Sequence, residues 1–183
     1  DLGRFLPVLD RIFKMTRQKA DYLGYKKNPY EPIFNQYEDD FSVIDLELYF
    51  QELKNFLKKI DLNKFTDNRL KRIKDISYDA GNMKKLNGSI LKFLGADPKI
   101  FRLDVSTHPF SIFMSLDDIR LTTNYNEKDF TSSLFPTVHE FGHGLFASQA
   151  DKELEFTPLW PEPSYVLHES QSRFWENMIA RDR

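Results

Sequence analysis

The 183-residue sequence predicts a mainly α-helical protein with one small antiparallel β-sheet next to a helix of its C-terminal half. Two observations support this fold class. Apolar residues recur at spacings of three and four over 2–23, over 46–60 and over 83–94, which is typical of amphipathic helices. Alternation of apolar and polar residues is confined to 101–105 and 118–123, two segments of the length expected for strands.

The first predicted element is an amphipathic helix over residues 2–23. Pro7 is tolerated only near the first turn, because proline lacks the N–H that a helix interior needs. Gly24 favours the left-handed backbone conformation that commonly ends a helix. The sequence Asn-Pro-Tyr-Glu-Pro at 28–32 then predicts a turn, which leads into a short segment at 33–37.

The second predicted helix is marked by the residues at its N-terminus. Ser42 can cap the helix, and Asp45 stands where the acidic partner of a capping box is expected. The apolar periodicity continues from there to Ile60. Residues 61–80 are polar and favour no structure strongly, and a helix near 68–76 is the best match within them.

A third helix is expected over 83–94, with Gly95 as its stop signal. The pattern changes after Pro98. The alternating segments 101–105 and 118–123 are predicted to pair as antiparallel strands, and residues 107–116 are expected to connect them.

The next helix is expected to begin near Lys128 or Thr131. Pro136 is awkward inside it, so either the regular helix begins near this proline or the helix is kinked there. A proline-rich loop around 158–163 then leads to a final helix from about Tyr165.

The composition excludes several classes of protein. Hydrophobic residues make up 40% of the chain and include 17 Phe, which is enough for a sizeable core. Charged residues make up 30% with a net charge of −2, so no nucleic-acid partner is expected. No apolar run approaches the roughly 20 residues of a membrane span, so no membrane partner is expected. The lack of cysteine excludes disulfides, thiolate catalysis and cysteine-based zinc sites, and it fits a cytoplasmic location.

Two histidines four residues apart, His139 and His143, are the most informative feature of the sequence. Residues at i and i+4 share one face of an α-helix, so both imidazoles can bind one metal ion from the same side. With Glu140 between them they form the HExxH arrangement, in which the glutamate holds a metal-bound water. Gly142 and Gly144 each cost a helix interior about 1 kcal/mol relative to alanine. We therefore expect substrate or a packed helix to approach closely there.

A catalytic zinc site needs a third protein ligand, and Glu169 is the best candidate in the sequence. The fourth position would then hold a water whose pKa falls to about 7, and Glu140 would accept its proton as the general base. Each of these residues also has an explanation that involves no metal. A single glutamate such as Glu169 is more often a surface carboxylate, and a single histidine such as His108 or His168 is more often structural.

Four motifs occur together: HPF at His108-Pro109-Phe110, DxRxT at Asp118–Thr122, HExxH at His139–His143 and HESQ at His168–Gln171. In this order they resemble the M32 family of metallocarboxypeptidases, also called the thermostable carboxypeptidase 1 family. The resemblance is strong from Phe101 to the end of the sequence and looser over 1–60. An ordered set of motifs is much more specific than HExxH alone.

The resemblance implies a mostly helical, neurolysin-like zincin fold with a deep groove, and a reaction that removes C-terminal amino acids from peptides. It implies that His139, His143 and Glu169 bind one divalent metal ion per chain, zinc or cobalt, that Glu140 is the general base, and that the protein is a homodimer. The residues expected to bind substrate or brace the metal site are His108, Pro109, Phe110, Asp118, Arg120, Thr122, His168 and Gln171. Arg120 would either hold a peptide carboxylate or form a buried ion pair, with Asp118 or with the surroundings of Glu140.

The sequence departs from the family pattern in two respects. The family's downstream motifs IRxxAD and GxxQDxHW do not occur, and the arginine of the first is linked in the family to recognition of the substrate's C-terminal carboxylate. We therefore expect a fragment of one larger peptidase domain, with an N-terminal helical part at 1–97 and a catalytic metal-site part at 98–183. Pro136 also stands where family members usually carry a small residue such as glycine.

Two other functions remain open from the sequence. A thimet-like oligopeptidase would cleave peptides internally, including peptides with amidated C-termini that a carboxypeptidase should refuse. A truncated, non-catalytic fragment would bind metal or peptide without turnover. Replacing Glu140 by glutamine separates the enzymes from the binding fragment, because an enzyme should lose nearly all turnover and keep its metal.

Overall fold

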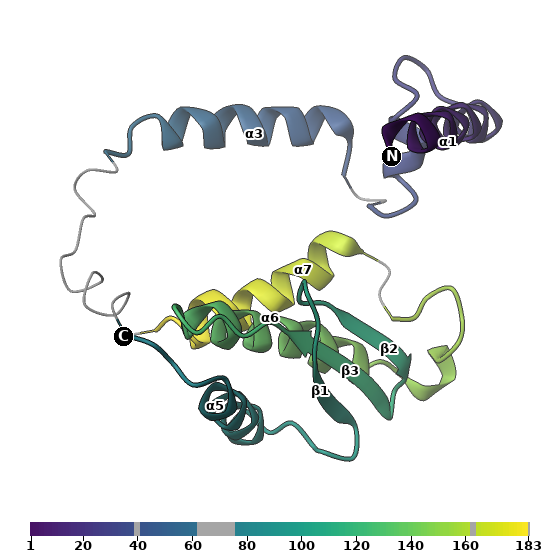
Figure 1. The fold of residues 1–183 in the computed structure, drawn as a ribbon. Helices are drawn as coiled ribbons and strands as arrows, with labels where there is room; N and C mark the ends of the chain where they lie inside the picture. The colour runs from purple at the N-terminus through teal and green to yellow at the C-terminus, as the bar shows by residue number, and fades with distance from the viewer. Residues whose placement is uncertain (39–40, 62–75, 162–163, 183) are drawn as a thin grey trace. The chain divides into compact units, whose positions relative to one another are not determined.

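The computed structural model describes residues 1–38, 41–61, 76–161 and 164–182. Contacts along the chain divide it into two compact units, Asp1–Leu62 and Asn63–Arg183. The prediction of a mainly helical fold with one small sheet is confirmed (Figure 1). Within the described ranges, none of the helices combines the length and the apolar character needed to cross a membrane.

The described residues of the first unit form three helices: α1 (Leu2–Leu23), α2 (Glu31–Phe34) and α3 (Val43–Leu57). Helix α1 has the predicted bounds, and Gly24 follows it with φ 80°, a left-handed value that glycine adopts without strain. The predicted capping box opens α3. The Ser42 N–H donates to Asp45 Oδ2 over 3.1 Å, and the Asp45 N–H donates to Ser42 Oγ over 3.1 Å. The helix suggested near 68–76 lies outside the described residues.

Helix α5 (Ala80–Phe93) opens the described part of the second unit. It begins earlier than predicted because Asp79 caps it, accepting the Asn82 N–H over 2.8 Å. The division of the chain into a helical part at 1–97 and a metal-site part at 98–183 remains a prediction. In the structure α5 packs against α6 and is grouped with the sheet.

In the part of the chain that the structure describes, the sheet has three strands, β1 (Phe101–Val105), β2 (Ser111–Ser115) and β3 (Asp118–Thr123), in the order β1-β3-β2. The predicted antiparallel pairing is wrong: β1 and β3 are neighbours but run parallel, while β2 pairs with β3 antiparallel. The cause is the segment expected only to connect them. It forms a strand that turns back into β3 as a hairpin, so β1 joins the other edge of β3 in the same direction.

Helix α6 (Thr131–Ser148) packs against the sheet and carries the centre of the core. The core side chains are Leu91, Ile119, Leu121, Phe141 and Ala147. Of the two alternatives for Pro136, a start near the proline is wrong, because the helix already begins at Thr131. Near the proline, the Ser133 carbonyl accepts hydrogen bonds from Thr137 Oγ1 at 2.7 Å and Thr123 Oγ1 at 3.1 Å. The Thr123 bond ties the first turns of α6 to β3, whereas the Thr137 bond lies within α6.

Helix α7 (Tyr165–Arg173) begins where the sequence predicted, with Ser164 as its cap. A short 3₁₀ turn, η2 (Lys152–Leu154), precedes it in the connecting loop. The chain then continues from α7 into a π-helical segment, η3 (Phe174–Ile179). Both α7 and η3 pack on α6, which in turn packs on the sheet (Figure 1).

Candidate metal centre

The two histidines of the HExxH motif lie one turn apart on α6. Their Nε2 atoms are 3.1 Å from each other. The side chains are 15% exposed for His139 and 11% exposed for His143, so both rings sit largely inside the protein. The helical spacing thus brings two imidazole nitrogens to one point, as i and i+4 residues should.

The two glycines of α6 make room for the elements on either side of it. A Cβ on Gly142 would lie 2.7 Å from Ser172 Cα and 3.0 Å from the Gln171 carbonyl oxygen, both in α7. A Cβ on Gly144 would lie 2.7 Å from Ile119 Cγ2 of β3. Of the two partners expected from the sequence, the packed helix accounts for Gly142, whereas Gly144 faces side chains of the sheet, a partner that was not expected.

The close approach at Gly142 brings Glu169 to the histidine pair. Its Oε2 lies 3.3 Å from His143 Nε2 and 3.8 Å from His139 Nε2. The ligand atoms of the three residues all fall within 4.8 Å of one another. Ligands 2.0–2.2 Å from a tetrahedral zinc ion are about 3.3–3.6 Å apart. The three side chains therefore fit a divalent metal ion in both chemistry and spacing.

Glu140 is buried, with 7% of its surface exposed. Burial raises the pKa of its carboxyl above the ordinary value, and a hydrogen bond with the Ser111 side chain and the charges of His139 and His108 oppose this rise. Glu140 is therefore a carboxyl on the metal-site helix whose pKa is shifted towards neutrality. Such a carboxyl has the character of a general base.

The imidazole of His143 stays neutral over a wide pH range. Burial lowers its pKa to about 4, and the neighbouring charges of His168 and His139 add to the effect. His168 stacks on it with ring centroids 4.2 Å apart and an interplanar angle of 20°. The rings of Phe113 and Phe146 also pack against His168, with centroids 5.6 and 5.8 Å from the centroid of its ring. The first residue of HESQ therefore packs directly on one of the two histidines of the candidate metal centre.

Thr122 of the DxRxT motif holds the HPF segment, which lies between β1 and β2. Its Oγ1 accepts the Phe110 N–H over 2.9 Å and donates to the Phe110 carbonyl over 3.0 Å. Its own N–H donates to the same carbonyl over 2.9 Å. His108 and Pro109 lie in this segment, and His108 is close enough to Glu140 to influence its pKa. Thr122 and the HPF segment thus form one braced turn, and His108 of this turn lies near Glu140 of α6.

Asp118 and Arg120 lie on the other face of the sheet. Ile119 and Leu121 are buried beneath it, and residues alternate between faces along a strand. The Arg120 guanidinium donates to both Asp118 oxygens, over 2.9 and 2.7 Å. The side chains remain 43% and 41% exposed, so the expected ion pair is present but is not buried. The structure does not bring either residue to the histidine pair.

Comparison with known proteins identifies the family. The profile of "Carboxypeptidase Taq (M32) metallopeptidase" matches residues 1–183, the whole chain. The chain belongs to the M32 family. It is 37% identical over 187 residues to thermostable carboxypeptidase 1 of Pyrococcus furiosus and 32% identical over 189 residues to carboxypeptidase 1 of Bacillus subtilis. These alignments cover 100% of this chain, and 38% and 37% of the respective relatives.

A solved structure agrees with these relatives. The BsuCP crystal structure matches with a TM-score of 0.83 and 31% identity, over 100% of this chain and 37% of that one. This M32 chain therefore spans less than two fifths of the length of the curated relatives that it matches.

One residue that contacts the candidate metal centre was not predicted from the sequence. Glu176 Oε2 lies 3.0 Å from His139 Nδ1, on the side of the ring away from Glu169. Burial raises the pKa of Glu176, but hydrogen bonds from Arg181 and His139 outweigh it and hold the pKa below its ordinary value. The sequence gives one indication of its role: Glu176 follows Glu169 by seven positions, and a regular helix would place the two glutamates on nearly the same face.

Gln171 is the last of the predicted site residues. Its side chain contacts Ser170 Oγ at 3.5 Å, while its backbone carbonyl faces Gly142. In the described structure Gln171 is therefore one of the residues at which α7 approaches α6 closely.

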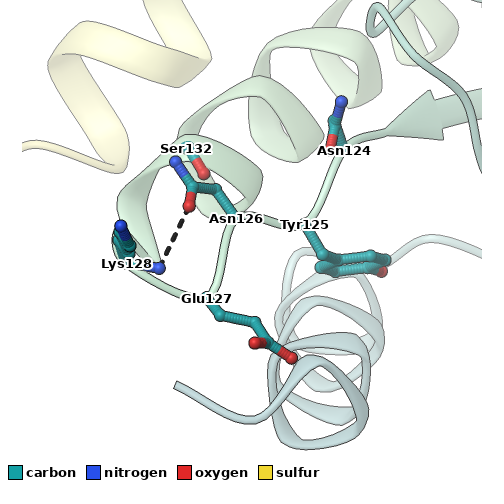
Figure 2. Close-up of a pocket in the computed structure, with 6 residues that line it drawn as sticks. All are labelled: Asn124, Tyr125, Asn126, Glu127, Lys128 and Ser132. Carbon is teal, nitrogen blue, oxygen red and sulfur yellow. Dashed lines mark hydrogen bonds between the residues drawn. The ribbon is translucent and has the colours of Figure 1, made fainter. Parts of the chain in front are cut away.

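An open pocket of about 620 Å³ lies elsewhere, on the loop between β3 and α6 (Figure 2). Its lining residues are Asn124, Tyr125, Asn126, Glu127, Lys128 and Ser132. Asn126 Oδ1 accepts the Lys128 N–H over 3.0 Å, which makes a local turn (Figure 2). None of the predicted site residues lines this pocket, so it is separate from the metal centre.

Proposed function

We propose that the protein is a metal-dependent carboxypeptidase, which hydrolyses the last peptide bond of a peptide at the centre built by α6 and α7. The observation that carries the proposal is the convergence of His139, His143 and Glu169, whose ligand atoms lie within 4.8 Å of one another. The M32 relatives named carboxypeptidases support the same reaction.

Zinc is the proposed metal, with cobalt as the second choice. Two imidazoles and one carboxylate form a ligand set that is typical of catalytic zinc sites and leaves a position for water. When bound, the ion would lower the pKa of that water to about 7 and polarise the scissile carbonyl.

Glu140 is proposed to move the proton. Its raised pKa makes it a stronger base than an exposed glutamate. It accepts a proton from the attacking water as the oxygen–carbon bond forms, and it passes this proton to the amide nitrogen as the carbon–nitrogen bond breaks. His143 remains neutral near pH 7, because its pKa is about 4, and so keeps a lone pair for the metal.

The test compares Glu140→Gln with Glu155→Gln. Glu155 is a part-buried carboxylate that accepts the Leu116 N–H over 2.7 Å on the sheet side, so its amide should preserve the fold. With zinc or cobalt supplied, the unchanged protein and Glu155→Gln should release the C-terminal residue from an N-blocked dipeptide. Glu140→Gln should bind the same amount of metal and lose at least about 100-fold in rate. Absence of metal binding at saturating zinc and cobalt would overturn the proposal.

An oligopeptidase is not favoured, because the matching family and relatives are carboxypeptidases. A peptide with an amidated C-terminus provides the direct comparison. We expect no cleavage of that peptide, and internal cleavage would contradict the proposed specificity.

From the family resemblance we also propose that the substrate is a peptide, that the protein forms a homodimer and that it acts in the cytoplasm. Sedimentation equilibrium tests the dimer, since a single species with the mass of one chain would contradict it.

A further inference from the structure

We propose that Glu176 is a positioning residue for the metal site: it orients His139, and Arg181 in turn holds Glu176. The inference rests on the proposed metal-dependent function, because it assigns a role in presenting a ligand to the ion. It concerns residues that lie on the far side of the His139 ring from Glu169.

The contact determines which nitrogen of His139 can bind metal. Glu176 Oε2 lies 3.0 Å from His139 Nδ1. An ionised carboxylate can only accept, so Nδ1 must carry the proton and donate it. The other nitrogen, Nε2, then keeps its lone pair, and it is the atom that faces His143 and Glu169. A carboxylate on the second ring nitrogen is the usual way in which a protein fixes the tautomer of a metal-binding histidine.

Glu176 is itself held at both oxygens. Arg181 Nη2 donates to Oε1 over 2.6 Å, and Arg173 Nη1 donates to Oε2 over 3.2 Å. Only 10% of the Glu176 side chain is exposed, so water competes little for these bonds. The Arg181 guanidinium also lies over the Phe135 ring, 3.9 Å from its centroid. Arg181 therefore connects η3 to α6, the helix that carries His139.

The π-helical segment explains why these two residues meet. In a regular α-helix, residues five positions apart are rotated by about 140° and do not face each other. Glu176 and Arg181 are five apart and in direct contact. In η3 the backbone bonds span five residues, as in the 2.9 Å bond from the Ala180 N–H to the Trp175 carbonyl. The wider turn places Arg181 on the Glu176 side, and π-helical turns of this kind are frequent at functional sites.

A purely structural role is the competing explanation. Arg173 also bonds Glu169 Oε1 over 2.8 Å, so the cluster could serve only to hold the end of α7 together. The two roles make different predictions. A structural cluster would affect the stability of the fold, whereas a positioning residue would change the His139 tautomer and the affinity for metal in protein that remains folded.

The experiment uses Glu176→Gln, with Glu155→Gln as the matched control. Zinc affinity is measured by competition with a chelator, and the His139 tautomer is measured by ¹⁵N NMR on metal-free protein. We expect Glu176→Gln to bind zinc about 10–100-fold more weakly, as for other partners of metal-binding histidines. We expect His139 to change from the Nδ1–H tautomer to a mixture. Glu155→Gln should match the unchanged protein in both measurements.

A second variant, Arg181→Met, covers the case in which Glu176→Gln does not fold. It leaves the carboxylate in place and should weaken zinc binding less, with a smaller tautomer change. Unchanged tautomer and unchanged zinc affinity in the folded variants would overturn the inference. Failure of the proposed function would give a different result: the unchanged protein would bind zinc without releasing amino acids, or would not bind zinc at all. In either case the tautomer measurement on metal-free protein would still decide whether Glu176 orients His139.

Discussion

Replacing Gly142 by alanine tests the idea that the closeness of α6 and α7 creates the metal centre. The added Cβ would lie 2.7 Å from Ser172 Cα, 3.0 Å from the Gln171 carbonyl oxygen and 3.1 Å from Trp175 Cδ1. Two of these atoms belong to the backbone of α7, so no change of side-chain rotamer can relieve the contact. Restoring an ordinary separation of 3.4 Å requires the helices to move apart by about 0.7 Å.

Two opposing effects set the size of the change in stability. Alanine is favoured over glycine in a helix interior by about 1 kcal/mol. Overpacking a tight contact typically costs about 1–3 kcal/mol. The expected result is therefore a loss of up to about 2 kcal/mol in the free energy of unfolding of the metal-free protein.

The effect on metal binding should be larger than the effect on stability. Glu169 is carried by α7, and metal ligands tolerate displacements of only about 0.2 Å. We expect zinc affinity to fall by about tenfold or more, the range found when the surroundings of metal ligands are disturbed. Urea unfolding of metal-free protein and chelator competition with zinc measure the two quantities separately.

Gly88→Ala on α5 is the matched control, because its Cβ would meet no atom within 4 Å. It should raise stability by up to about 1 kcal/mol through helix propensity alone and leave zinc affinity unchanged. If Gly142→Ala behaves like Gly88→Ala in both assays, the reasoning from the helix crossing is refuted.

Two further predictions follow from the charges. The pKa of His143 is about 4 in the folded protein against an ordinary value of 6.5, so between these pH values only the unfolded chain binds the proton. The free energy of unfolding of the metal-free protein should therefore fall as the pH is lowered from about 6.5 to 4. Urea unfolding at several pH values should show a flatter pH dependence for His143→Gln. Equal slopes of unfolding free energy against pH in the two proteins would contradict this prediction. Arg120→Met should leave the KM for a blocked dipeptide unchanged, since its guanidinium is committed to Asp118; a large rise in KM would instead assign Arg120 to the substrate carboxylate.

Features that depend on a few neighbouring residues were predictable from the sequence. The capping box of Ser42 and Asp45 involves residues three positions apart, and its two hydrogen bonds are present as predicted. The end of α1 at Gly24 is equally local. In both cases the side chains act on the backbone of their own turn, so the rest of the chain does not alter the outcome.

The strand pairing was not predictable, because it depends on the path of the chain. Alternation identified 101–105 and 118–123 as strands, but it does not encode direction. The short strand Ser111–Ser115 between them decides the pairing, and its three central residues are all apolar, so it shows no alternation beyond its ends. The absence of a clear period concealed the element that makes β1 and β3 parallel.

The candidate metal centre also has some features that the sequence predicts and others that depend on tertiary contacts. The sequence by itself determined that His139 and His143 would share a helix face with Glu140 beside them, because the helical repeat places residues i and i+4 together. Only the tertiary structure decided the distance of Glu169 from the histidine pair, the packing partners of Gly142 and Gly144, and the contact of Glu176 with His139. These contacts join α6 to elements distant in sequence, and the approach of two helices is set by the side chains packed between them.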